Sequence, residues 1–201
     1  MAHQNIDRGD RYASWFTAGI AAVAGVWIVV QAGIRIAEVL HGTDVPVLAP
    51  FSGEQTVLPI GPGGSDVTVT VDQAVIAANS LAPITSVSLV LEAIVGALGL
   101  LGALVCLVLL CINLARGVAF SRLNSRLILL GTTSLLVAWA LGGLFRTMGV
   151  NGTFAAVSEH SYDNVIFSSD LGPLFAILAL GAIGTAFTVG ERLQRDTEGL
   201  V

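Results

Sequence analysis

The chain has 201 residues, of which 54% are hydrophobic and only 11% are charged, whereas about 25% of the residues of an ordinary soluble domain are charged. This composition excludes an ordinary soluble protein and predicts one membrane domain with several spans. The formal net charge of −5 argues against a surface that binds nucleic acid.

Four segments are long and apolar enough to cross the hydrocarbon core of a bilayer, which takes about 20 helical residues. They are about residues 15–34, 87–112, 127–145 and 171–189. Because polar and apolar side chains do not alternate in them, they predict an all-α transmembrane four-helix bundle. In the last segment Asp170 is expected to cap the helix, and Pro173 falls in the first turn, where a missing N–H is tolerated.

The orientation follows from the arginines, which account for all nine basic residues. Seven of them share one side of the predicted spans: Arg8, Arg11, Arg116, Arg122, Arg126, Arg192 and Arg195. Since cytoplasmic loops are enriched in Arg and Lys, this side is predicted to be cytoplasmic. It holds both termini, the loop of residues 113–126 and the tail of residues 190–201.

Two loops of unequal length remain outside, about residues 41–83 and 149–169. The stretch DVTVTVD, residues 66–72, alternates strictly and predicts a strand with one covered face. VPVLAPF and QTVLPI could pair with it, and GPGG, residues 61–64, predicts a turn. We therefore expect a small β-containing extracytoplasmic cap between the first and second helices.

Residues that could carry out catalysis or bind a metal are scarce. His41, His160 and Asp163 lack the tight spacing of metal ligands. Cys106 and Cys111 fall on different faces of one helix, which favours packing residues over a disulfide. The sequence contains no phosphate-binding glycine loop and no recognisable pair of nucleophile and base. We therefore expect no enzyme, no cofactor and no metal.

Four charged residues are expected near the outer ends of the spans: Arg35, Glu38, Glu92 and Arg146. Arg35 and Glu38 follow Gln31 on one face of the first helix. An ionisable group at this depth is expected to pair or to line a cavity. We predict an ion-pair cluster in the outer leaflet, with a ligand or proton site as the alternative.

Small residues are spread through the spans, among them Gly99, Gly102 and Gly184. They permit close approach of helices. Contacts within one chain explain them, and a homo-oligomer is compatible with them but is not required.

Two cytoplasmic segments resemble a known family. RGVAFSRLNSRLILLG, residues 116–131, matches a G-x-x-F-x-x-x-N loop at Gly117, Phe120 and Asn124. The tail GERLQRDTEGLV matches the family's closing pattern at Gly190, Leu193, Asp196, Glu198, Leu200 and Val201. On these motifs the chain resembles the bacterial membrane-protein family called domain of unknown function 2975 (DUF2975). The resemblance implies four spans in the bacterial plasma membrane, no established activity, and association with a small helix-turn-helix regulator of the Cro/C1 type encoded alongside.

In the tail, apolar Leu193, Leu200 and Val201 are interleaved with charges, which is typical of a docking peptide or of a tail folded back on the middle loop. In the second case Asp196, Glu198 or the terminal carboxylate could pair with the arginines of that loop. The alternative for those arginines is topology determination and attraction to anionic lipid headgroups.

The preferred function is a membrane tether or sensor that acts on a cytoplasmic partner, such as the helix-turn-helix regulator, and that makes no direct contact with nucleic acid. A small transporter or channel subunit is the alternative. It would need a polar path through the spans, and Gln31, Thr132, Thr133 and Ser134 are the residues that hint at one. A membrane-embedded enzyme would need paired catalytic groups at one depth, which the sequence does not show.

Overall fold

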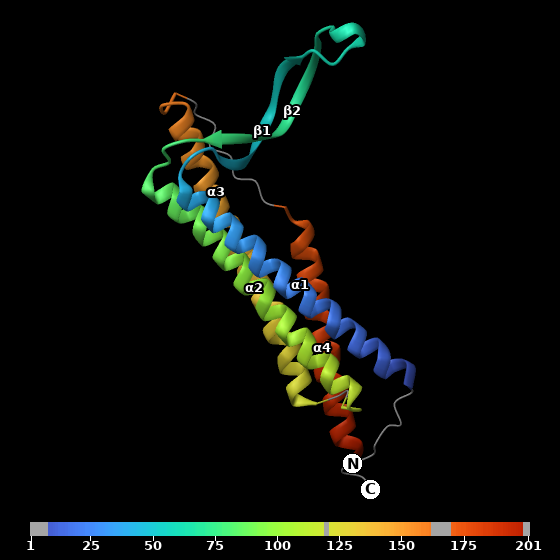
Figure 1. Ribbon diagram of the computed structural model, residues 1–201. Coiled ribbons are helices and arrows are strands. Elements are labelled where there is room, and N and C mark those ends of the chain that lie inside the picture. Colours follow the sequence, from blue (N-terminus) through green and yellow to red (C-terminus); the bar gives the residue numbers. More distant parts are fainter. Residues whose placement is uncertain (1–7, 119–120, 162–169, 199–201) are drawn as a thin grey trace. The chain divides into compact units, whose positions relative to one another are not determined.

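A computed structural model describes residues 8–118, 121–161 and 170–198. It contains four helices and one antiparallel hairpin (Figure 1). The helices are α1 (Arg8–His41), α2 (Pro83–Ala115), α3 (Arg122–Val157) and α4 (Gly172–Glu198). Between α1 and α2 lie the strands β1 (Val45–Leu58) and β2 (Val67–Ala78), joined through the short 3-10 helix η1 (Pro62–Gly64).

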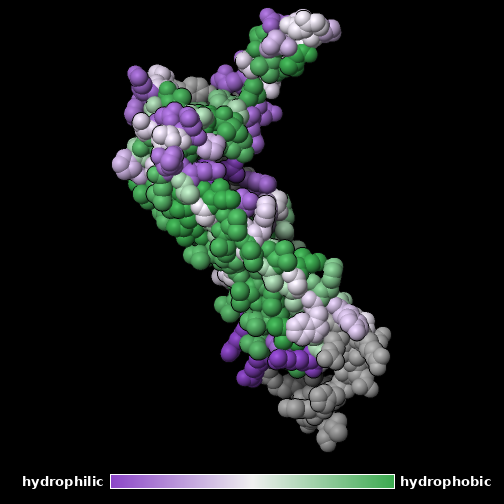
Figure 2. All heavy atoms as spheres, viewed as in Figure 1, coloured by the Kyte–Doolittle hydropathy of each residue, from purple (hydrophilic) through white to green (hydrophobic). Residues whose placement is uncertain are grey.

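All four helices contain a stretch that is long and apolar enough to cross a membrane: Tyr12–His41, Pro83–Ala115, Arg122–Val157 and Gly172–Leu193. Figure 2 shows apolar side chains covering the surface of the helices. The predicted four long apolar helices, with a small sheet between the first two, are therefore present, and they indicate a multi-pass membrane protein.

The helices are longer than the predicted spans. α3 continues to Val157, so residues 149–157 are helical and do not belong to a loop, as the predicted loop of residues 149–169 requires. α4 likewise continues to Glu198, so residues 190–198 extend the last helix instead of forming a separate tail. The reason is that the predicted ends followed the end of each apolar run. A helix satisfies its backbone hydrogen bonds internally and can continue through polar residues.

The chain divides into two compact units. The four-helix unit comprises residues 1–34, 93–142 and 170–201, and the hairpin unit comprises residues 35–92 and 143–169. Both strands therefore belong to the hairpin unit, together with the ends of α1, α2 and α3 that adjoin them in the chain.

Glycines allow the helices of the four-helix unit to approach closely. A Cβ atom added to Gly99 of α2 would lie 2.8 Å from the carbonyl oxygen of Ser134 of α3. One added to Gly102 would lie 2.6 Å from the hydroxyl of the same serine. Between α3 and α4, a Cβ on Gly184 would lie 3.1 Å from Ile128. These contacts leave no room for a larger residue at Gly99, whereas at Gly102 the hydroxyl of Ser134 would have to turn away.

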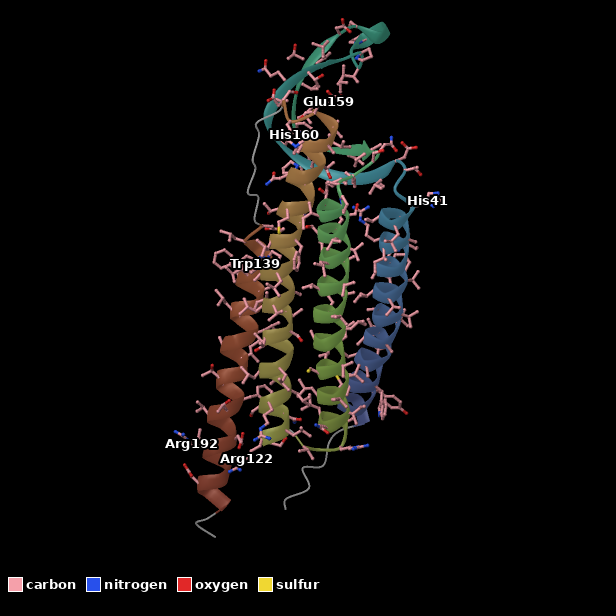
Figure 3. The ribbon with its side chains drawn as sticks, turned by 90° about the vertical axis from the view of Figure 1, so that its left-hand side faces the viewer. His41, Arg122, Trp139, Glu159, His160 and Arg192 are labelled. Carbon is pink, nitrogen blue, oxygen red and sulfur yellow. The ribbon has the colours of Figure 1, made fainter. Side chains whose placement is uncertain are left out.

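The start of α4 is tied to α3 within the same unit. Trp139 of α3, labelled in Figure 3, donates a hydrogen bond of 2.9 Å from Nε1 to the carbonyl oxygen of Asp170. The Asp170 carboxylate accepts the N–H of Gly172 at 2.9 Å. The predicted capping role of Asp170 is thereby confirmed.

In the hairpin unit, β1 and β2 pair from Val45 opposite Ala78 to Leu58 opposite Val67, with a register shift between Pro50 and Glu54. Two of the predicted strand segments, VPVLAPF and the beginning of QTVLPI, are therefore parts of one strand. Gly53 lies in the shift with a φ of 74°, a left-handed conformation that glycine adopts easily.

A hydrophobic core covers the first half of this hairpin. It consists of Val39, Val45, Val47, Ala49, Leu89, Val150 and Phe154. Alternate residues of β1 point into this core, as expected for a strand with one buried face. Residues 66–72 were predicted to form a strand with one covered face, but the valines of that face are not buried. Val67 is exposed, and Val69 and Val71 are half-buried. The covered face lies in the earlier strand because α1, α2 and α3 reach the hairpin there.

Candidate functional site

The end of α2 is closed by a Schellman motif around Gly117, the first residue of the family-like loop pattern. The N–H of Val118 donates to the carbonyl of Asn113 at 3.0 Å, and the N–H of Gly117 donates to that of Leu114 at 3.0 Å. Gly117 has a φ of 85°, which disfavours residues with a Cβ. The glycine is therefore explained by the backbone of the loop.

Asn124, the last residue of that pattern, holds the loop between α2 and α3. Its side chain is 0% exposed. Its Nδ2 donates to the carbonyl of Val118 at 2.7 Å, and its Oδ1 accepts from Nδ2 of Asn113 at 2.7 Å. Its backbone N–H donates to the hydroxyl of Ser121 at 3.2 Å, which caps the start of α3. The buried side chain of Asn124 is thus engaged within the chain and is not presented to a partner.

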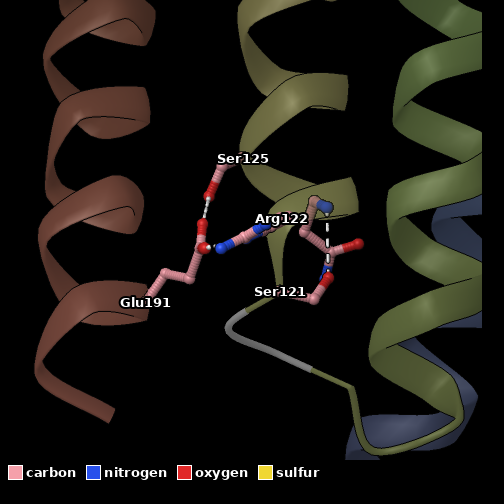
Figure 4. A network of polar contacts seen from close by, with 5 residues as sticks. Ser121, Arg122, Ser125 and Glu191 are labelled. Atoms are coloured by element: carbon pink, nitrogen blue, oxygen red, sulfur yellow. Dashed lines mark hydrogen bonds and ion pairs between the residues drawn. The ribbon is translucent and has the colours of Figure 1, made fainter. Parts of the chain in front are cut away.

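Glu191 connects the end of α4 to the start of α3 (Figure 4). Its Oε1 lies 3.5 Å from Nε of Arg122, and its Oε2 accepts a hydrogen bond of 3.1 Å from the hydroxyl of Ser125. The side chain of Arg122 is 71% exposed, whereas that of Glu191 is only 14% exposed. The exposed arginine contributes little as an ion pair, but the hydrogen bond to a nearly buried carboxylate favours one position of α4.

The sequence prediction missed Glu191 and named Asp196, Glu198 or the terminal carboxylate as partners of the loop arginines. A signal for Glu191 was present. Glu191 lies two residues after the fourth predicted apolar run, and Arg122 lies five residues before the third, so the two fall at similar depth when both segments are helices.

The predicted docking residues differ in their exposure to solvent or lipid. Leu193 is 61% exposed on α4, and Asp196 is exposed one turn later. Gly117 closes the end of α2, and Asn124 bonds to Val118 and Ser121 on either side of the loop. Phe120, Leu200 and Val201 lie outside the described residues, as does the side chain of Glu198.

The predicted charged cluster lies entirely in the hairpin unit, but only two of its members pair. Nη1 of Arg35 donates to Oε2 of Glu38 at 3.3 Å, one turn along α1. Glu92 is half-buried and forms no ion pair within 4.0 Å among the described residues. Of the predicted ion-pair cluster, the structure thus contains the pair of Arg35 with Glu38, and pairing of Glu92 with Arg35 or Arg146 stays a prediction. A pair between neighbouring turns forms more easily because the helix itself aligns the two side chains.

The other residues considered as ligands stand apart. In Figure 3 His41 lies at the end of α1, and His160 lies with Glu159 at the end of α3. Within the described ranges, no group of three or more His, Cys, Asp or Glu residues could hold a metal ion. Cys106 and Cys111 are both free thiols.

A groove of about 440 Å³ lies between α3 and α4, beside the contact of Glu191 with Arg122. Its charged lining residues are Arg122, Arg126 and Glu191. Near this groove, described side chains join α2 to α3 through Asn113 and Asn124, and α3 to α4 through Ser125, Arg122 and Glu191.

Comparison of the chain with protein-family models, with curated proteins and with solved structures finds no match. The resemblance to domain of unknown function 2975 therefore stays a prediction that rests on the two quoted segments.

Proposed function

We propose that this protein is a tether or sensor in the plasma membrane of a bacterium and that it acts on a cytoplasmic partner. In this proposal both termini and the loop between α2 and α3 are cytoplasmic, and the hairpin unit lies outside the cell. The division of the chain supports it. The four-helix unit contains the seven arginines that mark the cytoplasmic side, and the hairpin unit contains Arg35 and Arg146.

The observation that carries the proposal is the charged end of α4, which continues as a helix to Glu198 beyond its apolar run of about residues 171–189. The projecting end exposes Arg192, Leu193 and Asp196, and we call these three residues the α4 end. A helix that exposes an apolar side chain between charges suits recognition by a groove of a partner protein. Beside that helix, the buried Asn124 bonds to Val118 after the end of α2 and to Ser121 at the start of α3.

The transporter alternative has less support. Thr132 lines the groove between α3 and α4, whereas Ser134 packs against Gly99 and Gly102 at the contact of α2 with α3. These polar residues therefore face different neighbours and do not define one path. A helix-turn-helix regulator, as the resemblance to domain of unknown function 2975 implies, fits the α4 end as a partner without any such path.

The proposed topology predicts which cysteines a membrane-impermeant maleimide reaches in intact cells. In a background with Cys106→Ala and Cys111→Ala, Ser65→Cys near the end of the hairpin should label from outside. Thr197→Cys should label only after the membrane is opened. Labelling of Thr197→Cys in intact cells would contradict the orientation, and the labelling of both sites after permeabilisation is the control for reactivity.

The tethering role is tested by removing the chain after Arg192, which retains Glu191 and its contacts with α3. The truncated protein should insert and melt like the full chain but should no longer co-purify with a co-expressed helix-turn-helix protein from the adjacent reading frame. In the full chain, Leu193→Ser should weaken co-purification more than Asp196→Asn. A buried leucine contributes about 1.5–3 kcal/mol, whereas an exposed charge contributes under about 1 kcal/mol. Unchanged co-purification after truncation would refute docking at the α4 end.

A further inference from the structure

The groove between α3 and α4 has a basic end and an apolar end. Arg122 and Arg126 both line it, one helical turn apart on α3. Glu191 lines it from α4, so its charged lining residues carry a formal net charge of +1. Further along α3 the lining consists of Ile128, Leu129 and Thr132, and α4 contributes the small residues Gly181, Gly184 and Thr185.

The apolar end continues into a second groove of about 310 Å³. Ile128 and Thr132 line both grooves, and leucines of α2, α3 and α4 provide most of the remaining surface of the second one. Along about ten residues of α3, or roughly 15 Å, the surface thus changes from guanidinium groups to hydrocarbon.

The depth of this surface in a membrane follows from the candidate spans. Arg122 lies five residues before the apolar run of α3, about residues 127–145, and Glu191 lies two residues after that of α4, about residues 171–189. Both therefore lie where a span leaves the hydrocarbon core, at the level of the lipid headgroups. The apolar part of the groove lies deeper, at the level of the acyl chains.

We infer that this groove binds one anionic phospholipid, with its phosphate at Arg122 and Arg126 and an acyl chain along the apolar part. The net charge of +1 complements a headgroup of net charge −1, such as that of phosphatidylglycerol, better than a zwitterionic headgroup. Guanidinium groups bind phosphate through paired N–H donors, and basic pockets between membrane helices favour anionic lipids. The inference concerns the helices themselves and is independent of the proposed tethering role.

Within the site the two arginines differ. Arg122 already contacts Glu191 through Nε. Arg126 forms no ion pair with any residue that the structure describes. Arg126 is therefore the main ligand of the phosphate, and Glu191 limits the positive charge of the groove.

The test is native mass spectrometry of the full chain in detergent, titrated with phosphatidylglycerol or with phosphatidylethanolamine. We expect wild type to bind phosphatidylglycerol more tightly. Arg126→Gln should weaken that binding about tenfold, the loss expected for one hydrogen bond to a charged group. Arg116→Gln is the matched control, because it removes the same charge from the same end of the helices but outside the groove, and its binding should stay close to that of wild type.

Two further variants separate binding from folding. Glu191→Gln should strengthen phosphatidylglycerol binding because it removes the negative charge from the groove, whereas damage to the fold would weaken it. Gly181→Leu should weaken binding without a change of charge, since a Cβ at Gly181 would already lie 4.0 Å from Thr132 across the groove. Equal affinity of wild type for both lipids would overturn the inference. So would equal losses in Arg126→Gln and Arg116→Gln, or a dimer that closes the groove and excludes lipid.

Discussion

Replacement of Phe154 by Ala is expected to lower the free energy of unfolding of the hairpin unit by about 3–5 kcal/mol. Phe154 is 6% exposed and belongs to the core that α1, β1, α2 and α3 share. Its ring packs edge-to-face on that of Phe51 of β1, with centroids 5.4 Å apart. The substitution removes this aromatic contact and leaves a cavity between strand and helix.

This loss is measurable by protease resistance of the hairpin unit and by denaturant titration of the full chain in detergent micelles. Phe154→Leu should cost less because it keeps most of the apolar volume. Phe175→Ala is the matched control, since Phe175 is 67% exposed on α4, and it should leave the hairpin unit unchanged. Equal resistance of Phe154→Ala and wild type would show that this core does not hold the hairpin.

Replacement of Asn124 by Ala is expected to destabilise the four-helix unit by about 2–4 kcal/mol. The variant would leave the carbonyl of Val118 and the side-chain amide of Asn113 without their partner. An unsatisfied buried polar group costs about 1–3 kcal/mol. The free energy of unfolding in detergent, followed by tryptophan fluorescence, reports the change.

A double-mutant cycle with Asn113→Ala isolates the side-chain bond. Once Asn113 is replaced, the additional cost of Asn124→Ala should fall by about 1 kcal/mol, the typical contribution of a hydrogen bond. Additive losses would mean that the two amides do not interact. Thr133→Ala, at an exposed position of α3, controls for the change in helix propensity.

The four spans were predictable from the sequence because each apolar run is long enough to settle the structure by itself. The strand β2 was predictable from the alternation in residues 66–72, although that pattern could not show which half of the hairpin is covered. That depends on where α1, α2 and α3 reach β1, which is a tertiary property. The extension of α3 to Val157 was equally hidden, because its last turns pack through Gly149 and Gly152 on residues of α2 far away in the chain.

At the candidate site, the pattern of Gly117 and Asn124 was visible, but its role was not. An asparagine that is buried and one that binds a partner look alike in a sequence, and only the bonds to Asn113 and Val118 distinguish them. Glu191 was missed because it is far in the chain from the residue that it contacts. Its partner Ser125 lies 66 residues away, so no local spacing connects the two.

The bonds of Asn124 also bear on the order in which the protein assembles. Asn124 and Asn113 are 11 residues apart, and the bond from Asn124 to Val118 spans 6 residues. Contacts of such low sequence separation close quickly. The turn between α2 and α3 can therefore form while α4 is still being synthesised. The bond between Ser125 and Glu191 must wait until α4 has been synthesised. The groove beside it thus lacks its α4 wall until α4 has left the ribosome, and during that interval lipid can cover the exposed face of α3.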